Sequence, residues 1–302
     1  MASRSYRLKT KDGVAEGVRR IALGRAEKAL DELASAEDGE LAAAIHGARK
    51  DLKKMRAVVR LIREELGEDL FKSENRHYRE AGRLLSGSRD AEVKLETLTA
   101  LRDRSGDDLP STAAELWRAM LARERDEVVD AAGGETAGQI DAAGEAIEEG
   151  RVRILDWPLK TDDWNLVGPG LAKGYEQGRR ALKRTLAEPR AENVHEWRKR
   201  AKDLWYQLRI VREAWPSLLG ETAEQAHELA DLLGDHHDLA VLADDLASRD
   251  EIGDKSAFGN AIKRRQDELL AAALDLGQRL YAEKPKAFKR RLKRYWIAWR
   301  EA

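Results

Sequence analysis

The sequence has 302 residues, of which 55 are Lys or Arg and 56 are Asp or Glu, so its formal net charge is −1. Because 42% of the residues are apolar and the net charge is small, the composition excludes an intrinsically disordered chain, which combines low hydrophobicity with high net charge. The absence of Cys excludes disulfide bonds and thiolate metal sites, and no apolar run approaches the roughly 20 residues of a membrane span. The first 13 residues contain no apolar signal core, so we expect a cytoplasmic protein.

Helices are expected along nearly the whole chain, because there are only six Pro and the sequence is rich in Ala, Leu, Glu, Lys and Arg. In chain order, the apolar pattern of the first half predicts helices at 13–35, 40–66, 68–86, 90–104 and 111–132. In the second half it predicts helices at 168–187, 191–214, 217–234, 238–249, 256–282 and 285–300. The stretch 157–170, which contains two Pro, is the expected linker. The predicted fold class is all-α.

Three short segments of the first half recur in the second half in the same order. The pairs are 6–12 with 157–163, 45–50 with 194–199, and 84–90 with 232–238, at offsets of 151, 149 and 148 residues. Recurrence in a constant register indicates an internal duplication. We therefore predict two tandem halves, residues 1–150 and residues 151–302, each long enough for a helical bundle.

The duplicated segments begin two strongly basic helices. Residues 45–63 contain seven Lys or Arg and one acid, and residues 194–212 contain six against two. At about 100° per residue, the cations of each segment fall on one arc of the helix and the apolar residues fall on another. Like charges spaced three or four residues apart destabilise an isolated helix. Their presence in two equivalent places therefore favours a functional cationic surface over an ordinary solvated face.

Basic and acidic residues are also concentrated in different segments of the chain. Residues 284–300 contain eight Lys or Arg and no acid, whereas 124–149 contain nine acids and one Arg, and 219–251 contain ten acids and one Arg. A net charge near zero is thus compatible with a local region of high positive potential. Two basic stripes suit a long, flexible polyanion, whose phosphates Arg can bind through two oxygens at once.

The spacing His46-x-x-Arg49-Lys50-x-x-Lys53, repeated as His195-x-x-Arg198-Lys199-x-x-Lys202, resembles the CHAD (conserved histidine α-helical domain) family. The resemblance extends over essentially the whole chain. It implies two helical bundles related by pseudo-two-fold symmetry, with a basic groove or pore that binds inorganic polyphosphate, and in some members an association with polyphosphate granules. Many relatives also carry a triphosphate-tunnel enzyme domain with a Glu-x-Glu-x-Lys signature, which this sequence lacks. We therefore expect a non-enzymatic binding protein without cofactor or metal.

The expected polyphosphate site consists of the basic residues of the two repeated helices. One side of the groove is predicted to contain His46, Arg49, Lys50, Lys53, Arg56 and Arg60. The other side is predicted to contain His195, Arg198, Lys199, Lys202 and Arg209. Weaker candidates for the rim are Arg20, Lys173, Lys286, Lys289, Arg290 and Lys293. Protonation of the two His would add hydrogen-bond donors, and a bound polyanion would favour it.

Two other classes of function fit parts of the sequence. His46, His236, His237 and Asp238 are residue types used by metal-dependent HD-type phosphohydrolases. Against a metal site, the repeat aligns His237 with Arg89, which cannot ligate a metal, and we expect Asp90 and Asp238 to cap the helices that follow them. Nucleic-acid binding is the other alternative, with Trp197 or Trp205 stacking on bases. The C-terminal basic helix could also lie on an anionic membrane surface.

Overall fold

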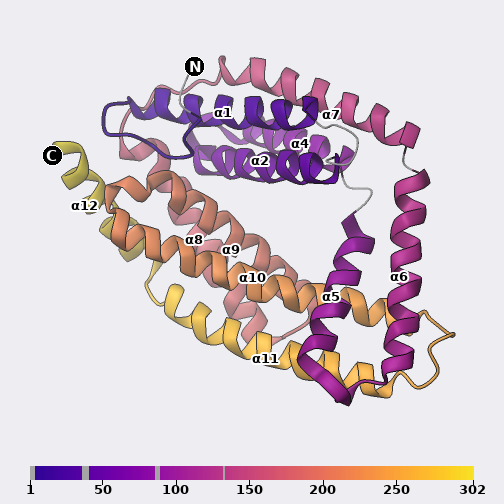
Figure 1. The fold of residues 1–302 in the computed structure, drawn as a ribbon. Coiled ribbons are helices and arrows are strands. Elements are labelled where there is room, and N and C mark those ends of the chain that lie inside the picture. The colour runs from indigo at the N-terminus through magenta and orange to yellow at the C-terminus, as the bar shows by residue number, and fades with distance from the viewer. Residues whose placement is uncertain (1–3, 36–40, 86–88, 132) are drawn as a thin grey trace.

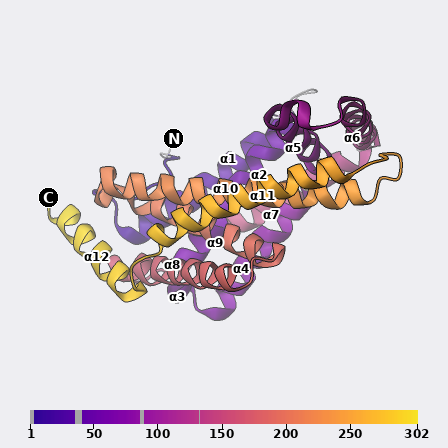
Figure 2. The ribbon, with the colours of Figure 1, turned by 90° about the horizontal axis from the view of Figure 1, so that it is seen from below.

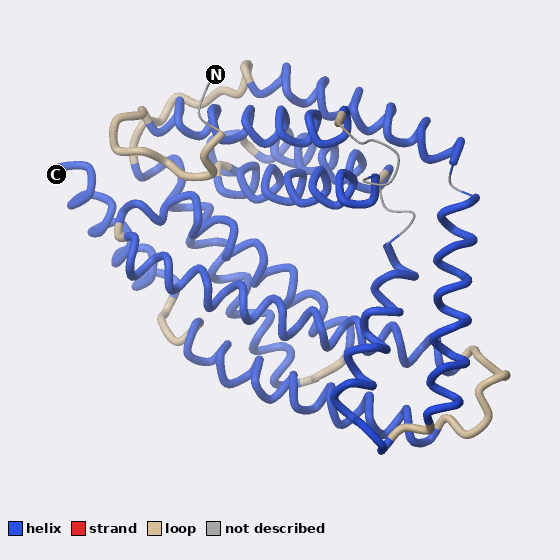
Figure 3. The backbone as a smooth tube through the Cα atoms, viewed as in Figure 1, coloured by secondary structure: helices blue, strands red, loops and turns tan. Residues whose placement is uncertain are grey.

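A computed structural model describes residues 4–35, 41–85, 89–131 and 133–302, and in this part of the chain all regular structure is helical (Figures 1 and 3). The first half contains α1 (Val14–Ala34), α2 (Leu41–Leu61), α3 (Arg63–Leu66), α4 (Glu68–Leu84), α5 (Arg89–Ser105), η1 (Gly106–Asp108), α6 (Ser111–Ala131) and α7 (Gly133–Ile154). The second half contains α8 (Trp164–Ala187), α9 (Ala191–Val211), η2 (Arg212–Ala214), α10 (Pro216–Ala247), α11 (Ser256–Leu280) and α12 (Pro285–Glu301). The all-α prediction is confirmed.

Helices α1, α2, α4 and α7 form a four-helix bundle, in which each helix packs against two others (Figure 1). The side chains that face its centre come from the apolar arcs of the sequence, with Ala29, Met55, Val59 and Ile147 fully buried. The second half packs α9 between α8 and α10, with α11 against α10 and α12 against α8. One large core cluster contains residues of both halves. Burial of apolar surface therefore joins the two halves directly.

Helices α5 and α6 form a hairpin that belongs to the first half in sequence but packs against α10 and α11 of the second half (Figures 1 and 2). Their contact has its own apolar cluster, in which the rings of Trp117 and Phe258 lie edge to face with centroids 5.5 Å apart. The two halves are consequently interlocked.

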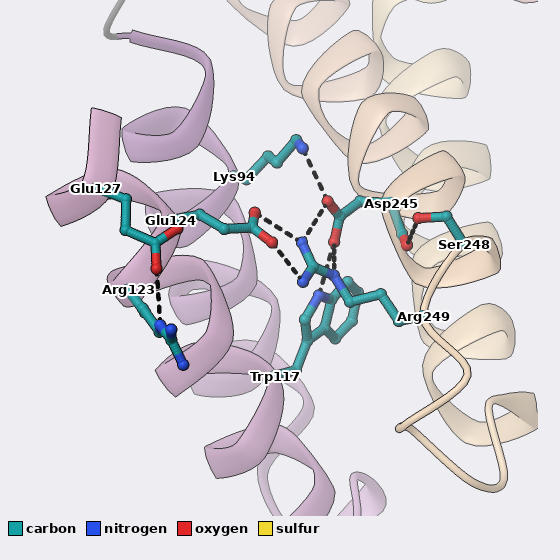
Figure 4. Close-up of polar contacts among 8 residues, drawn as sticks. All are labelled: Lys94, Trp117, Arg123, Glu124, Glu127, Asp245, Ser248 and Arg249. Carbon is teal, nitrogen blue, oxygen red and sulfur yellow. Dashed lines mark hydrogen bonds and ion pairs between the residues drawn. The ribbon is translucent and has the colours of Figure 1, made fainter. Parts of the chain in front are cut away.

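An ion cluster around the buried Asp245 fastens this hairpin to α10 (Figure 4). Asp245 accepts hydrogen bonds from Lys94 Nζ at 2.8 Å, from Trp117 Nε1 at 2.9 Å and from Arg249 Nε at 2.7 Å. Arg249 also donates to both carboxylate oxygens of Glu124, at 2.7 and 2.9 Å. Burial raises the pKa of Asp245, but the hydrogen bonds from Arg249, Lys94 and Trp117 outweigh it and hold this pKa at about 2. The buried charge of Asp245 is thus paired with cations, as a buried charge requires.

Close contact between α2 and α8 sets the distance between the halves. A Cβ atom at Gly170 would collide with the carbonyl oxygen of Leu61, at the end of α2. Only Gly therefore allows the two backbones to approach this closely, and this approach fixes the position of α2 relative to α8.

Several element boundaries differ from those predicted. Helix α7 was not predicted, and residue 150, the proposed boundary of the halves, lies inside it. Helix α10 continues through Gly234, so the predicted break between 234 and 238 is wrong, and Asp238 lies within the helix rather than at its N-cap. Helix α8 begins at Trp164, inside the predicted linker.

The side chain of Asp90 lies outside the described residues, and the pseudo-two-fold relation stays a prediction. None of the described helices is both long and apolar enough to cross a membrane.

Candidate functional site

A basic cleft of about 670 Å³ lies between the two halves of the chain. Its walls come from α2, α3 and α4 of the first half and from α8 and α9 of the second half. Ten Lys or Arg line it, against the two carboxylates Glu196 and Asp203. The cations are Lys53, Arg56, Arg60, Arg63, Arg79, Arg83, Lys173, Lys199, Arg200 and Lys202. This ratio makes the cleft strongly electropositive.

The packing of α2 and α9 explains why their cations reach the cleft. The apolar arc of α2, with Val58 and Val59, is buried in the first bundle, and that of α9, with Leu204 and Leu208, is buried in the second. Each cationic arc lies beside a buried arc, so it emerges at the edge of its bundle. The two edges meet where α2 approaches α8 and α9.

Ion pairs inside the cleft hold several guanidinium groups in place. Arg60 Nη1 donates to Asp203 Oδ1 at 2.6 Å, and Arg200 Nε donates to Glu196 Oε1 at 2.8 Å. Burial and the neighbouring charge of Arg60 lower the pKa of Arg56 to about 10, which still leaves it charged at pH 7. Arg56 Nε donates to Asn75 Oδ1 at 3.3 Å. The cleft therefore holds charged, positioned donors of the kind that bind phosphate oxygens.

Six of the seventeen predicted site residues line this cleft together. They are Lys53, Arg56, Arg60, Lys173, Lys199 and Lys202. Residues from both basic helices, α2 and α9, thus line one space.

The remaining predicted residues on the bundles do not line the cleft. Arg49 Nη1 donates to the carbonyl oxygen of Leu85 at 3.1 Å, and Arg20 donates to Asp12 and to backbone carbonyls near the N-terminus. The guanidinium of Arg209 lies over the rings of Tyr6 and Trp205. His46, Lys50, His195 and Arg198 are the other four in this group.

The predicted rim residues of α12 lie away from the cleft. Helix α12 packs on α8 through the Tyr175 and Phe288 rings, whose centroids are 4.0 Å apart. On a helix, Tyr175 and the cleft residue Lys173 project about 160° apart, so α12 and the cleft lie on opposite sides of α8. Lys286, Lys289, Arg290 and Lys293 are therefore not part of the cleft lining.

His195 packs against α10 next to the cleft, with its ring centroid 4.5 Å from that of His237. Burial and the charges of Lys199, His237 and Arg198 lower the pKa of His195 to about 4. This histidine is therefore neutral at pH 7 in the free protein.

We expect the NMR titration of the His195 ring to have its midpoint near pH 4 in the free protein. Because the unfolded chain binds this proton near pH 6.5, the unfolded state takes up more protons between pH 6.5 and pH 4. The stability linked to neutral His195 is present above pH 6.5 and is lost as the pH falls through this window. The His195→Gln variant assigns the resonance and should lose less stability than the wild type from pH 7 to pH 5. A midpoint near 6.5 would contradict the burial argument.

Four cleft cations were not among the predicted site residues: Arg63, Arg79, Arg83 and Arg200. Arg63 falls on the same arc as the α2 stripe, so its position was visible in the helical projection. Arg79 and Arg83 are spaced i,i+4 on α4, but both lie beside Glu80 and form ion pairs with it. Mixed charge of this kind looks like an ordinary solvated helix face.

Three residues of the metal-site alternative, His236, His237 and Asp238, are consecutive in α10. His237 faces His195, and Asp238 Oδ1 lies 3.8 Å from Arg198 Nη1. Within the described residues, no three His, Asp or Glu side chains gather in a way that could hold a metal ion.

Comparison with known proteins agrees with this architecture. No curated protein matches the sequence. Among solved structures, the chain is similar to the crystal structure of the CHAD domain from the plant Ricinus communis, with a TM-score of 0.56 and 15% identity over 94% of this chain and 96% of that chain. At this identity the likeness shows the fold alone. The profile of the CHAD domain matches residues 24–247, well over half of the sequence. The chain therefore belongs to the CHAD-domain family.

Proposed function

We propose that this protein binds inorganic polyphosphate in the basic cleft and acts as a binding module without catalytic activity. The observation that carries the proposal is the convergence of ten Lys and Arg from five helices on one cleft, whose lining by described residues includes two carboxylates. In line with the family resemblance, we further propose that it acts in the cytoplasm, at polyphosphate granules.

The chemistry of the lining suits a repeating phosphate ligand. Arg side chains bind pairs of phosphate oxygens, and Lys adds point charges that tolerate changes in register. Because the cations come from both halves of the chain, a flexible polymer can contact both walls at once. Multiple weak contacts of this kind add up to high affinity for a long ligand.

The burial of two Trp side chains disfavours the nucleic-acid alternative. The two Trp considered for base stacking are buried, with Trp197 0% and Trp205 7% exposed. Stacking needs an open ring face, which these side chains do not offer. A polyanion without bases therefore fits this cleft better than a nucleic acid does.

A calorimetric titration with long-chain polyphosphate tests the proposal. We expect affinity to fall on the order of 100-fold between about 50 mM and about 200 mM salt, because each neutralised phosphate releases a bound counterion. Duplex DNA of equal phosphate concentration serves as the control and should bind more weakly. Undetectable binding at low salt, or tighter binding to DNA, would contradict the proposed ligand. Phosphate release from either ligand would contradict a non-enzymatic role.

A further inference from the structure

The cleft contains a carboxylate placed among its cations. Asp203 on α9 accepts a hydrogen bond from Arg60 of α2 at 2.6 Å, and its second oxygen lies 3.5 Å from Arg200 Nη1. The Asp203 side chain is 11% exposed and that of Arg60 22%. This ion pair therefore connects the two halves across the cleft and is only weakly screened by solvent.

The surroundings of Asp203 show why a negative charge is favourable there. Arg56 and Arg60 lie close enough for the charge of Arg60 to lower the pKa of Arg56, and the charge of Asp203 acts in the opposite direction. Asp203 thus offsets the repulsion between neighbouring cations in the free protein. A phosphate in the cleft would carry the same charge and seek the same guanidinium donors.

We propose that Asp203 is an internal counter-anion, which a phosphate polymer must displace from Arg60 to occupy the centre of the cleft. The inference rests on the proposed polyphosphate binding. Asp203 lowers affinity because the ligand gains the Arg60 contact only by breaking an existing one. The carboxylate therefore sets how tightly the cleft holds its ligand.

The Asp203→Asn variant tests this role, because Asn keeps the shape of the side chain and removes its charge. We expect long-chain polyphosphate to bind about tenfold more tightly, since the uncharged amide oxygen of Asn holds Arg60 by a weaker hydrogen bond than the carboxylate does. The salt dependence should also steepen by about 0.7 in the slope of log K against log salt, because one more cation is free to neutralise a phosphate.

Glu283→Gln is the matched control, because Glu283 is paired with Arg291 at 2.6 Å and does not line the cleft. It removes the same charge and should leave binding unchanged. Asp203→Glu retains the charge and should keep the salt slope of the wild type, which separates charge from shape and gives a second measurement if the Asn variant does not fold.

The outcomes distinguish this inference from the proposed function. If the wild type does not bind polyphosphate, the proposed function fails. If the wild type binds but Asp203→Asn binds equally or more weakly, Asp203 is only a structural tie between the halves. Tighter binding by Asp203→Glu, or by Glu283→Gln, would equally overturn a role of the Asp203 charge.

Discussion

Replacing Arg79 and Lys199 together by Glu should lower polyphosphate affinity by at least about 100-fold, because two charge-assisted contacts are lost and two repulsive charges replace them. Arg79 lies on the α4 wall of the cleft and Lys199 on the α9 wall, so the variant changes both halves of the chain. Their side chains are 45% and 54% exposed, and we expect the fold to tolerate the change. Calorimetric titration measures the affinity, and circular dichroism checks the helix content.

The charge-matched control is Lys286→Glu with Lys293→Glu on α12. Both side chains are exposed and lie outside the cleft lining. The net charge changes by the same amount, so a general electrostatic effect would weaken both variants alike. We expect the α12 variant to bind almost as well as the wild type. Equal weakening would mean that the ligand does not depend on the cleft.

Replacing Asp245 by Asn should destabilise the protein by about 3–5 kcal/mol, because a buried ion pair loses one partner while the other remains buried. Asp245 is 4% exposed at its side chain and joins Lys94 and Trp117 of the hairpin to Arg249 (Figure 4). Urea unfolding followed by circular dichroism measures the loss.

Lowering the pH should reproduce part of the stability loss caused by Asp245→Asn. The pKa of Asp245 is about 2 in the folded protein and 3.8 in the reference state, so its contribution to stability is present above pH 3.8 and is lost as the pH falls toward 2. Glu268→Gln provides the control. Glu268 pairs with Arg104 and Arg265, yet its side chain is 44% exposed, so the change should destabilise the protein far less than Asp245→Asn does. Equal losses for Asp245→Asn and Glu268→Gln would contradict the importance of burial.

The helices that could be predicted from the sequence are those whose apolar residues follow the helical period strongly. Helix α7 escaped prediction because Gly133, Gly134, Gly138, Gly144 and Gly150 give it low helix propensity. Its Ala143 and Ile147 are fully buried in the first bundle, so tertiary packing stabilises a helix that its local sequence does not favour. Helix α10 continues through Gly234 for a related reason, since Leu233 and Leu239 on either side are buried.

The candidate site likewise has a part that could be predicted from the sequence and a part that could not. The arcs of Lys53, Arg56 and Arg60 on α2 could be predicted, because the helical period alone determines which side chains share a face. The local spacing could not show that Arg198 would turn toward Asp238 of α10, or that Arg79 of α4 would complete the cleft wall. Those positions depend on how neighbouring helices cross.

The ion pair between Arg60 and Asp203 shows most clearly what could not be predicted from the sequence. The two residues are 143 positions apart, and no local pattern relates them. By itself, the sequence determined the all-α class and the two cationic arcs, because these follow from helical periodicity and composition. Only the tertiary structure decided which cations face one another, since the close approach of α2 and α8 at Gly170 and the interlocked α5–α6 hairpin set the relative position of the halves. Burial of apolar surface over both halves determines that position, and it depends on contacts between residues far apart in the chain.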